Sequence, residues 1–123
     1  MFVPYRESKI LKQLGFDEPC FRAYDNAECL YFSTNSENGY IYNHNLSTAI
    51  VAPTFEEAFD YIRNKFGLHI NPNPCGFEIL DYNNEHISWG CIVDELNDHD
   101  TNTNKLLGLK KGLEIINNNN YEK

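Results

Sequence analysis

The sequence predicts an α+β fold in which three helices and an antiparallel sheet of about five strands follow the order α-β-β-β-α-β-β-α. Three observations lead to this prediction. Residues 52–67 have the pattern of a complete amphipathic helix, pairs of apolar segments flank short polar turns as in β-hairpins, and helical spacing of apolar residues recurs near both ends of the chain. Hairpins build antiparallel sheets, so we expect the single-faced helices to cover one side of such a sheet.

Length and composition are those of one folded domain. A chain of 123 residues can bury about two thirds of the surface that its unfolded form exposes. With 41% hydrophobic and 14% aromatic residues, it differs from a disordered acidic tail. We therefore expect one α+β domain over residues 1–116. Residues 117–123, which begin with four asparagines, are expected to form a disordered tail.

The N-terminal part predicts one helix and one hairpin. The helix is expected from Pro4 or Tyr5 to Leu14, where a glycine follows as its stop. Residues 20–24 and 29–33 are aromatic-rich segments on either side of a four-residue polar turn, a spacing that is typical of a hairpin.

A third strand and the central helix follow. Residues 40–42 and 46–51 favour a strand that is broken at 43–45. Thr54 is placed to cap the central helix and Gly67 to end it in the left-handed conformation. We expect the apolar stripe of this helix to lie against the sheet; it consists of Phe55, Ala58, Phe59, Ile62 and Phe66.

The next segments predict a second hairpin. Residues 68–70 favour the start of a strand, but the prolines in 71–74 require a turn or an edge strand. Residues 77–82 and 86–93 then form a strand pair around two asparagines, which tolerate the positive φ of a tight turn.

A closing helix is expected over residues 104–116, after a polar connection at 97–102. Its apolar face consists of Leu106, Leu109, Leu113 and Ile116. Gly108 and Gly112 each weaken an isolated helix by about 1 kcal/mol relative to alanine. We therefore expect this helix to depend on packing against the rest of the fold.

The negative net charge of the chain disfavours several classes of binding partner. The net charge is −8, so phosphate backbones and anionic membrane surfaces are repelled. The tight basic pair Lys110-Lys111 is too small to neutralise several phosphates. The N-terminal residues lack the pattern of a secretion signal, and no apolar run is long enough to span a membrane. We expect a cytoplasmic protein without nucleic-acid or membrane partners, whose partner is a basic or neutral protein surface.

The four cysteines predict neither disulfides nor a metal centre. Three of Cys20, Cys29, Cys75 and Cys91 lie in apolar segments that resemble strands, where cysteine behaves as a small hydrophobic residue. A reducing cytoplasm favours free thiols. The close ligand pairs of most zinc sites are missing; Cys20 and Cys29 would face each other across the hairpin, and His86 and Cys91 fall on opposite faces of one strand. We therefore expect no metal.

Catalytic motifs are weak. Cys91 follows Trp89-Gly90 in the manner of some reactive thiols, but it continues into a strand rather than a helix N-terminus, so a place in the core is preferred. No glycine-rich phosphate loop is present, which argues against a nucleotide cofactor. We expect no cofactor, and the sequence identifies no catalytic residue.

One acidic loop near the closing helix is a weak candidate for an acid–base or cation site. His99 lies between two aspartates, which would raise the pKa of the imidazole rather than make it a good base. A cation site would need the carboxylates of Asp94, Glu95, Asp98 and Asp100, but this segment lacks the glycine that gives calcium loops their sharp turn. A solvated loop is the preferred interpretation.

Aromatic residues in the predicted strands are the remaining candidates for binding. A single-stranded nucleic acid could stack on such rings if lysines and arginines lay between them. Arg22 stands alone among these aromatics, so packing in the core and on the sheet is the preferred interpretation; the aromatics are Phe21, Tyr24, Tyr31, Phe32, Tyr40 and Tyr42.

Three stretches together resemble a known family. Residues 3–5 with 11–20, residues 52–66, and a helix ending near 113–116 are similar to short uncharacterised proteins encoded by phages and prophages of gut Bacteroidetes. Where such proteins commonly have Trp-Phe in the central helix, this chain has Tyr61-Ile62, a change within the packing face. The resemblance implies mobile-element cargo that acts in a bacterial cytoplasm, and it implies no catalytic residue or ligand.

Two functional hypotheses follow. The first is a non-enzymatic protein-interaction module, a phage accessory or host-interfering protein whose acidic surface binds a host or phage protein. The alternative is a small enzyme or ligand-binding domain with a pocket between sheet and helices. The alternative requires that at least two reactive side chains converge in that pocket; the candidates are His44, His69, His86, Cys91 and Asp94.

Overall fold

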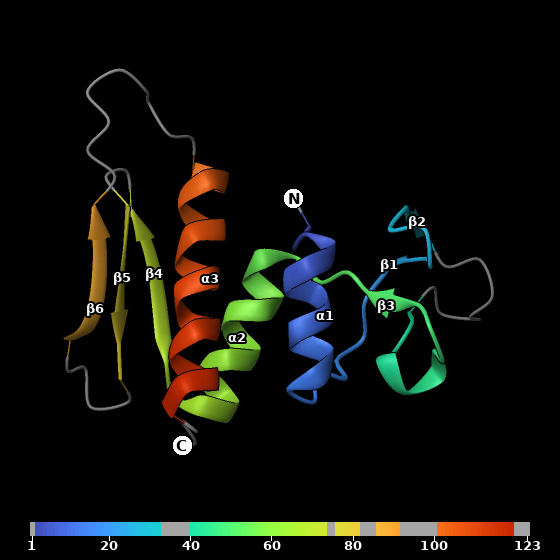
Figure 1. The fold of residues 1–123 in the computed structure, drawn as a ribbon, viewed down its shortest axis with the longest axis horizontal. Coiled ribbons are helices and arrows are strands. Elements are labelled where there is room, and N and C mark those ends of the chain that lie inside the picture. The colour runs from blue at the N-terminus through green and yellow to red at the C-terminus, as the bar shows by residue number, and fades with distance from the viewer. Residues whose placement is uncertain (1, 33–39, 74–75, 82–85, 92–100, 120–123) are drawn as a thin grey trace. The chain divides into compact units, whose positions relative to one another are not determined.

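The chain forms two compact units, each with its own three-stranded antiparallel sheet (Figure 1). The computed structural model describes residues 2–32, 40–73, 76–81, 86–91 and 101–119. The units are Met1–Ala58, here the N-terminal unit, and Phe59–Lys123, the C-terminal unit. The α+β class is confirmed, and the helices and strands follow the predicted order with one more strand before the last helix. One sheet of about five strands is corrected to two sheets of three strands within the described residues.

The N-terminal unit begins with α1 (Tyr5–Gln13), and its sheet contains β1 (Arg22–Tyr24), β2 (Leu30–Phe32) and β3 (Ile50–Val51). The strand order is β2-β1-β3, and both pairs are antiparallel. Helix α1 packs on β3. Gly15 has φ 96°, so the predicted glycine stop of the first helix is confirmed.

The turn between β1 and β2 is fixed by Asp25. Its Oδ1 atom accepts the backbone N–H groups of Ala27 at 2.8 Å and Cys29 at 3.0 Å, and its own N–H donates to the Cys29 carbonyl at 3.0 Å. Glu28 takes φ 62°, a left-handed conformation that this turn imposes on a non-glycine residue. The predicted first hairpin is therefore confirmed, with shorter strands than expected.

The N-terminal segment is held to this sheet by Val3. The Val3 N–H donates to the Pro53 carbonyl at 2.8 Å, and the Val3 carbonyl accepts the hydroxyl groups of Tyr24 at 2.8 Å and Ser8 at 3.1 Å. The rings of Tyr5 and Tyr24 pack edge to face, with centroids 5.7 Å apart. The buried hydrophobic residues of this unit include Val3, Leu11, Phe16, Cys20, Ala23, Ile50, Val51, Ala52 and Phe55.

The predicted break in the third strand is confirmed as a single 3-10 turn, η1 (Asn43–Asn45). Before it, Ile41 makes an isolated antiparallel bridge with Cys20; after it, the chain enters β3. Lys12 of α1 donates from Nζ to the carbonyl of Ala49 at 2.9 Å, which fixes the approach to β3.

The central helix is α2 (Phe55–Phe66), which crosses the boundary between the two units. Its predicted cap is confirmed as a reciprocal capping box: Thr54 Oγ1 accepts the Glu57 N–H at 3.2 Å, and Glu57 Oε1 accepts the Thr54 N–H at 3.0 Å. Gly67 ends the helix with φ 72°, as expected.

The burial and contacts of α2 differ from the prediction at one residue and in the element that the helix was expected to cover. Four of the five predicted apolar positions are buried, namely Phe55, Ala58, Ile62 and Phe66, but Phe59 is half-buried. The principal helix contacts of the two sheets are made by α1, on β3, and by α3, on β4 and β5, rather than by α2. A three-stranded sheet is narrow enough for one helix to cover, so α2 is not needed as a sheet cover.

The C-terminal unit has the strand order β4-β5-β6, with β4 (His69–Asn73), β5 (Gly76–Leu80) and β6 (His86–Cys91). Pro72 lies within β4, and β4 is an edge strand, which is one of the two outcomes predicted for the prolines in 71–74; the other proline lies outside the described residues. The second predicted hairpin is confirmed as the β5–β6 pair. The turn predicted at residues 83 and 84 lies outside the described residues.

The closing helix α3 (Thr101–Asn119) lies alongside β4 and β5 (Figure 1). It begins before and ends after the predicted range, so residues 117–119 of the expected tail are helical. Its two central glycines face the sheet: a Cβ atom at Gly108 would lie 2.9 Å from Ile70 Cγ2, and one at Gly112 would lie 2.6 Å from Ile70 Cδ1. The expected dependence of this helix on packing thus has a structural basis, because the glycines permit close approach to β4.

Candidate functional site

The two histidines of the pocket hypothesis whose side chains are described are exposed and belong to different units. His44 is exposed on η1, in the N-terminal unit, and His69 is exposed on β4, in the C-terminal unit. His86 and Cys91 lie on β6, but their side chains are outside the described structure, as are Asp94 and the acidic loop around His99. No described contact therefore supports the pocket hypothesis.

His44 instead forms a surface pair with Asp17. Its Nδ1 atom lies 2.6 Å from Asp17 Oδ2, and its backbone N–H donates to Asp17 Oδ1 at 2.9 Å. The backbone hydrogen bond from His44, together with hydrogen bonding and charge attraction from its ring, lowers the pKa of the Asp17 carboxyl group. The His44 ring also packs on Tyr42, with centroids 5.2 Å apart.

This pair fits a structural role better than a catalytic one. A carboxylate orients the imidazole in Ser-His-Asp hydrolases, but there the other ring nitrogen contacts a nucleophile. Among the described residues, no side-chain hydroxyl or thiol is hydrogen-bonded to His44, and the side chains of His44 and Asp17 are 60% and 42% exposed. The pair joins η1 to the segment after α1.

The described cysteines differ from each other. Cys20 is buried, as expected, and burial is the main cause that raises the pKa of its thiol to about 12, with a smaller contribution from the carboxylates of Glu57 and Glu18. Cys29 is exposed, so its predicted role as a buried hydrophobic residue is wrong. Both are free thiols, and Cys20 faces Ile41 rather than Cys29.

Metal ligation and membrane insertion find no support in the described residues. No group of three or more histidine, cysteine, aspartate or glutamate side chains there is arranged to hold a metal ion. In the same part of the chain, no helix combines the length and the apolar composition needed to cross a membrane.

Four large hydrophobic residues are exposed around the first hairpin. Phe21 is 53% exposed, Tyr40 42%, Leu30 39% and Tyr31 37%. We call these four the hairpin surface. Phe21 and Tyr40, from separate segments, pack their rings together with centroids 4.7 Å apart. Of the strand aromatics expected in the core or on the sheet, three are exposed rather than in the core, while Tyr24 is half-buried.

The sequence of β2 indicates this exposure only once the extent of the sheet is known. Neighbouring residues of a strand point to opposite faces, so the apolar pair Leu30-Tyr31 places one side chain on each face of β2. Both side chains can be buried only if both faces of the strand are covered. A short strand of a three-stranded sheet is poorly placed for that, so exposure follows.

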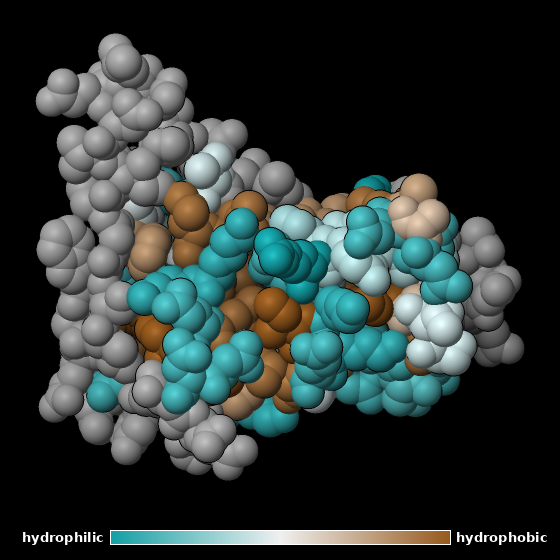
Figure 2. All heavy atoms as spheres, in the orientation of Figure 1, coloured by the Kyte–Doolittle hydropathy of each residue, from teal (hydrophilic) through white to brown (hydrophobic). Residues whose placement is uncertain are grey.

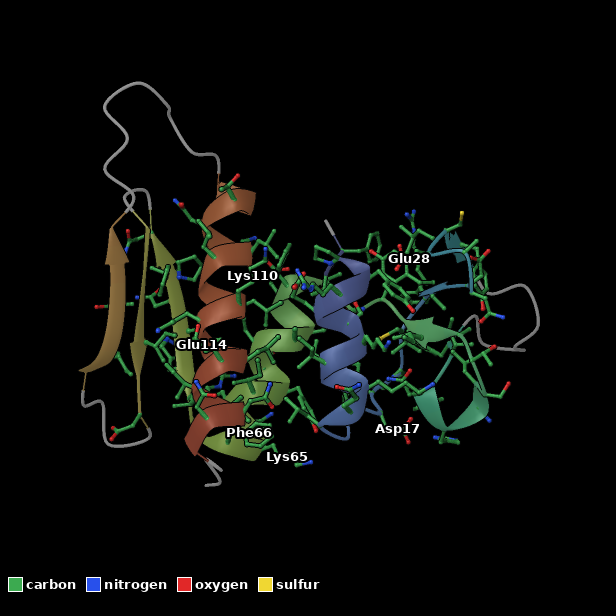
Figure 3. The ribbon with its side chains drawn as sticks, in the orientation of Figure 1. Asp17, Glu28, Lys65, Phe66, Lys110 and Glu114 are labelled. Carbon is green, nitrogen blue, oxygen red and sulfur yellow. The ribbon has the colours of Figure 1, made fainter. Side chains whose placement is uncertain are left out.

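Acidic residues accompany the hairpin surface. Residues 17–31 contain four acidic residues, Asp17, Glu18, Asp25 and Glu28, and one basic residue, Arg22. The guanidinium carbon of Arg22 lies 4.4 Å from the centroid of the Phe2 ring. Figure 3 shows Glu28 at the turn between β1 and β2, and Asp17 in the segment that follows α1.

The surface of this region is mixed in character. In Figure 2, hydrophilic residues in teal alternate with paler and brown residues over the part of the molecule that holds β1, β2 and β3. Exposed aromatic rings can bind cations by cation–π contact, and carboxylates of the same segment can add charge attraction. The hairpin surface is thus the candidate binding site with the most direct structural evidence.

Comparison with protein-family models, with curated proteins and with solved structures finds no match for this chain. Its chemistry is therefore inferred from the residues described above.

Proposed function

We propose that this protein is a non-enzymatic interaction module whose hairpin surface binds a basic segment of a protein partner. The observation that supports this proposal is the exposure of Phe21, Leu30, Tyr31 and Tyr40 around one hairpin. Single exposed hydrophobic residues are ordinary on protein surfaces, whereas exposed aromatic residues that contact each other, as Phe21 and Tyr40 do, are typical of binding sites.

Aromatic side chains suit this role energetically. Burial of apolar surface contributes about 25 cal/mol per Å². Tyrosine and phenylalanine lose little conformational entropy when they are fixed, and tyrosine is enriched among residues that dominate interface energies. The ring pair of Phe21 and Tyr40 is already formed, so part of this surface is ordered before a partner binds.

Charge selects the kind of partner. Carboxylates outnumber basic groups four to one in residues 17–31, and the whole chain carries −8. Lysine or arginine side chains of a partner would be attracted to these carboxylates and could stack on the exposed rings. The same charge disfavours nucleic acid, because a binding surface for phosphates needs several basic groups.

The cellular context comes from the resemblance to phage and prophage proteins. A phage accessory protein acts in the host cytoplasm, so the proposed partner is a host or phage protein with an exposed basic segment. This context sets where the partner is to be sought, and the hairpin surface sets how it is bound.

Site-specific photo-crosslinking in bacterial cells tests the proposal. Benzoylphenylalanine at position 31 is expected to give a discrete crosslinked protein, whereas the same group at Asn64, an exposed position of α2, is expected to give none. Phe21→Ser combined with Tyr40→Ser should remove the crosslink. When crosslinking is carried out in a cell lysate instead, high salt should weaken the crosslink and nuclease should leave it unchanged. Equal crosslinking at both positions, or a crosslink that survives the serine substitutions, would contradict the proposal.

A further inference from the structure

We infer that the partner adds an extended strand to the outer edge of β2, with backbone hydrogen bonds to Leu30. This inference rests on the proposed function and specifies its binding mode. It follows from the backbone of the hairpin, from the state of the other sheet edges and from the charge around β2.

The hydrogen-bond pattern of the hairpin determines where the backbone of Leu30 points. Antiparallel pairs alternate between those that exchange hydrogen bonds and those that do not. The Asp25 N–H donates to the Cys29 carbonyl, so the Ala23–Tyr31 pair exchanges hydrogen bonds and the Tyr24–Leu30 pair does not. The N–H and C=O groups of Leu30 therefore point away from β1.

The hydrogen bonds at the other edge of the sheet, formed by β3, follow the same alternation. Between β1 and β3, the Ala52 N–H donates to the Arg22 carbonyl, so the N–H of the preceding residue, Val51, points away from β1. This outward N–H donates to Asn43 Oδ1 at 3.0 Å. No such partner for the Leu30 backbone is present among the described residues. β2 pairs with β1 alone in that part of the chain.

The edge strands β2, β3 and β4 therefore differ in whether a further strand could pair with them. Unpaired edges attract further strands, and natural sheets block them with prolines or with side chains that satisfy the outward backbone groups. β3 is blocked by Asn43, and β4, an edge of the second sheet, contains Pro72. β2 contains no proline, and within the described residues no side chain is hydrogen-bonded to its outward backbone groups. Its side chains Leu30 and Tyr31 are exposed.

The occupant that fits this edge is an extended segment in which apolar residues alternate with lysine or arginine. Strand addition gives affinity through backbone hydrogen bonds and specificity through alternate side chains. Leu30 and Tyr31 lie on opposite faces of β2, so an added strand would meet an apolar side chain on each face. Glu28 and Asp25, in the adjoining turn, favour basic residues on that strand.

Two blocked peptides serve as probes, an acetylated and amidated (Lys-Val)4 and its (Glu-Val)4 counterpart, titrated to millimolar concentration against ¹⁵N-labelled full-length protein. We expect the lysine peptide to shift the Leu30 and Tyr31 amides and to slow hydrogen exchange at Leu30, and the glutamate peptide to do neither. Slower exchange reports a new hydrogen bond on the outward N–H, which side-chain contact alone would not produce.

Two substitutions at one position separate backbone from side-chain binding. Leu30→Pro removes the outward N–H without removing a β1–β2 hydrogen bond, while Leu30→Ala shortens the side chain and keeps the N–H. Loss of one hydrogen bond corresponds to about fivefold weaker binding, so Leu30→Pro should bind the lysine peptide at least that much more weakly than Leu30→Ala. If Leu30→Pro fails to fold, the exchange measurement on the unmodified protein decides.

The outcomes separate this inference from the proposed function. Binding with unchanged exchange at Leu30, or equal weakening by the two substitutions, would overturn strand addition and leave an interaction through side chains. No response of Leu30 to the lysine peptide, with the Tyr31 crosslink still formed in cells, would also overturn strand addition alone. Absence of both the peptide response and the crosslink would overturn both proposals.

Discussion

The side-chain oxygen of Asn43 accepts a hydrogen bond from the backbone N–H of Val51 at 3.0 Å. The Nδ2 atom of Asn43 donates to the Phe16 carbonyl at 2.8 Å, and the residue is only 5% exposed. One buried amide therefore joins η1 to the segment after α1 and closes the β3 edge of the first sheet.

We predict that Asn43→Ala destabilises the protein by at least about 2 kcal/mol, because a buried donor and a buried acceptor each lose their partner. Urea denaturation measures this change. Asn45→Ala, at an exposed position of the same 3-10 turn, is the matched control and should change stability by less than about 0.5 kcal/mol. Equal effects of the two substitutions would show that the Asn43 hydrogen bonds contribute little.

The core of α2 provides a second pair of substitutions. Ile62 is fully buried, whereas Phe59 is half-buried. We predict that Ile62→Ala costs about 2 to 5 kcal/mol, the range for truncation of a buried aliphatic side chain. Phe59→Ala should cost less than the range of about 3 to 5 kcal/mol that is typical of a buried phenylalanine. The sequence pattern alone would predict that larger cost, because it places Phe59 on the apolar face of the helix. If chemical denaturation showed a larger loss of stability for Phe59→Ala than for Ile62→Ala, the assignment of Ile62 as buried and Phe59 as half-buried would be wrong.

Local signals explain why the helices were predictable. The Thr54–Glu57 capping box and the stops at Gly15 and Gly67 depend on residues within one turn of the helix end. Such patterns are readable from the sequence because the groups that they satisfy are neighbours in the chain.

Pairing between distant segments explains what was missed. Cys20 pairs with Ile41, and Tyr24 with Ile50, so the third strand joins β1 although β2 and η1 lie between them in the sequence. No local pattern specifies such pairing, and the same strand pattern fits one sheet or two. The hairpin surface was missed for a related reason: aromatic residues suit both a core and an interface, and only the extent of the sheet decides whether they are covered.

Gly112 provides a third prediction, on packing between α3 and β4. Gly→Ala inside a helix normally stabilises it by about 1 kcal/mol. Here the new Cβ would lie 2.6 Å from Cδ1 of Ile70, which is 5% exposed. We predict that Gly112→Ala is less favourable by at least about 1 kcal/mol in the native sequence than in an Ile70→Val background, where that atom is absent.

A double-mutant cycle of Gly112→Ala and Ile70→Val, followed by urea denaturation, measures this coupling. Additive effects would indicate that Ile70 moves aside without cost. They would also weaken the explanation of why a glycine occupies the middle of this helix.

The thiols give a fourth prediction. Because burial raises the pKa of Cys20 to about 12, its reactive thiolate is scarce at pH 8, and its side chain is inaccessible. Cys29 is exposed. Iodoacetamide should modify Cys29 in the native protein at least about tenfold faster than Cys20, as read by peptide mass spectrometry. In denaturant the two rates should converge; a difference that persists there would have to come from local sequence rather than from the fold.

The last prediction concerns acid and the Asp17–His44 pair. The pKa of Asp17 is lowered in the folded protein, first by the backbone hydrogen bond from His44. A carboxyl group of this kind contributes stability that is present above its ordinary pKa of 3.8 and is lost as the pH falls through the folded value.

Asp17→Asn should therefore destabilise the protein at pH 6 and have a smaller effect at pH 2.5, because the stability that the native carboxylate contributes is progressively lost as the pH falls below 3.8 toward the lowered folded pKa. Both side chains are exposed, so the difference should stay below about 1 kcal/mol, as for other surface ion pairs. Asp60→Asn, which removes the exposed partner of Arg63, is the control for a general change in charge. A destabilisation by Asp17→Asn that does not change between the two pH values would mean that the charge of Asp17 is not what joins η1 to the segment after α1.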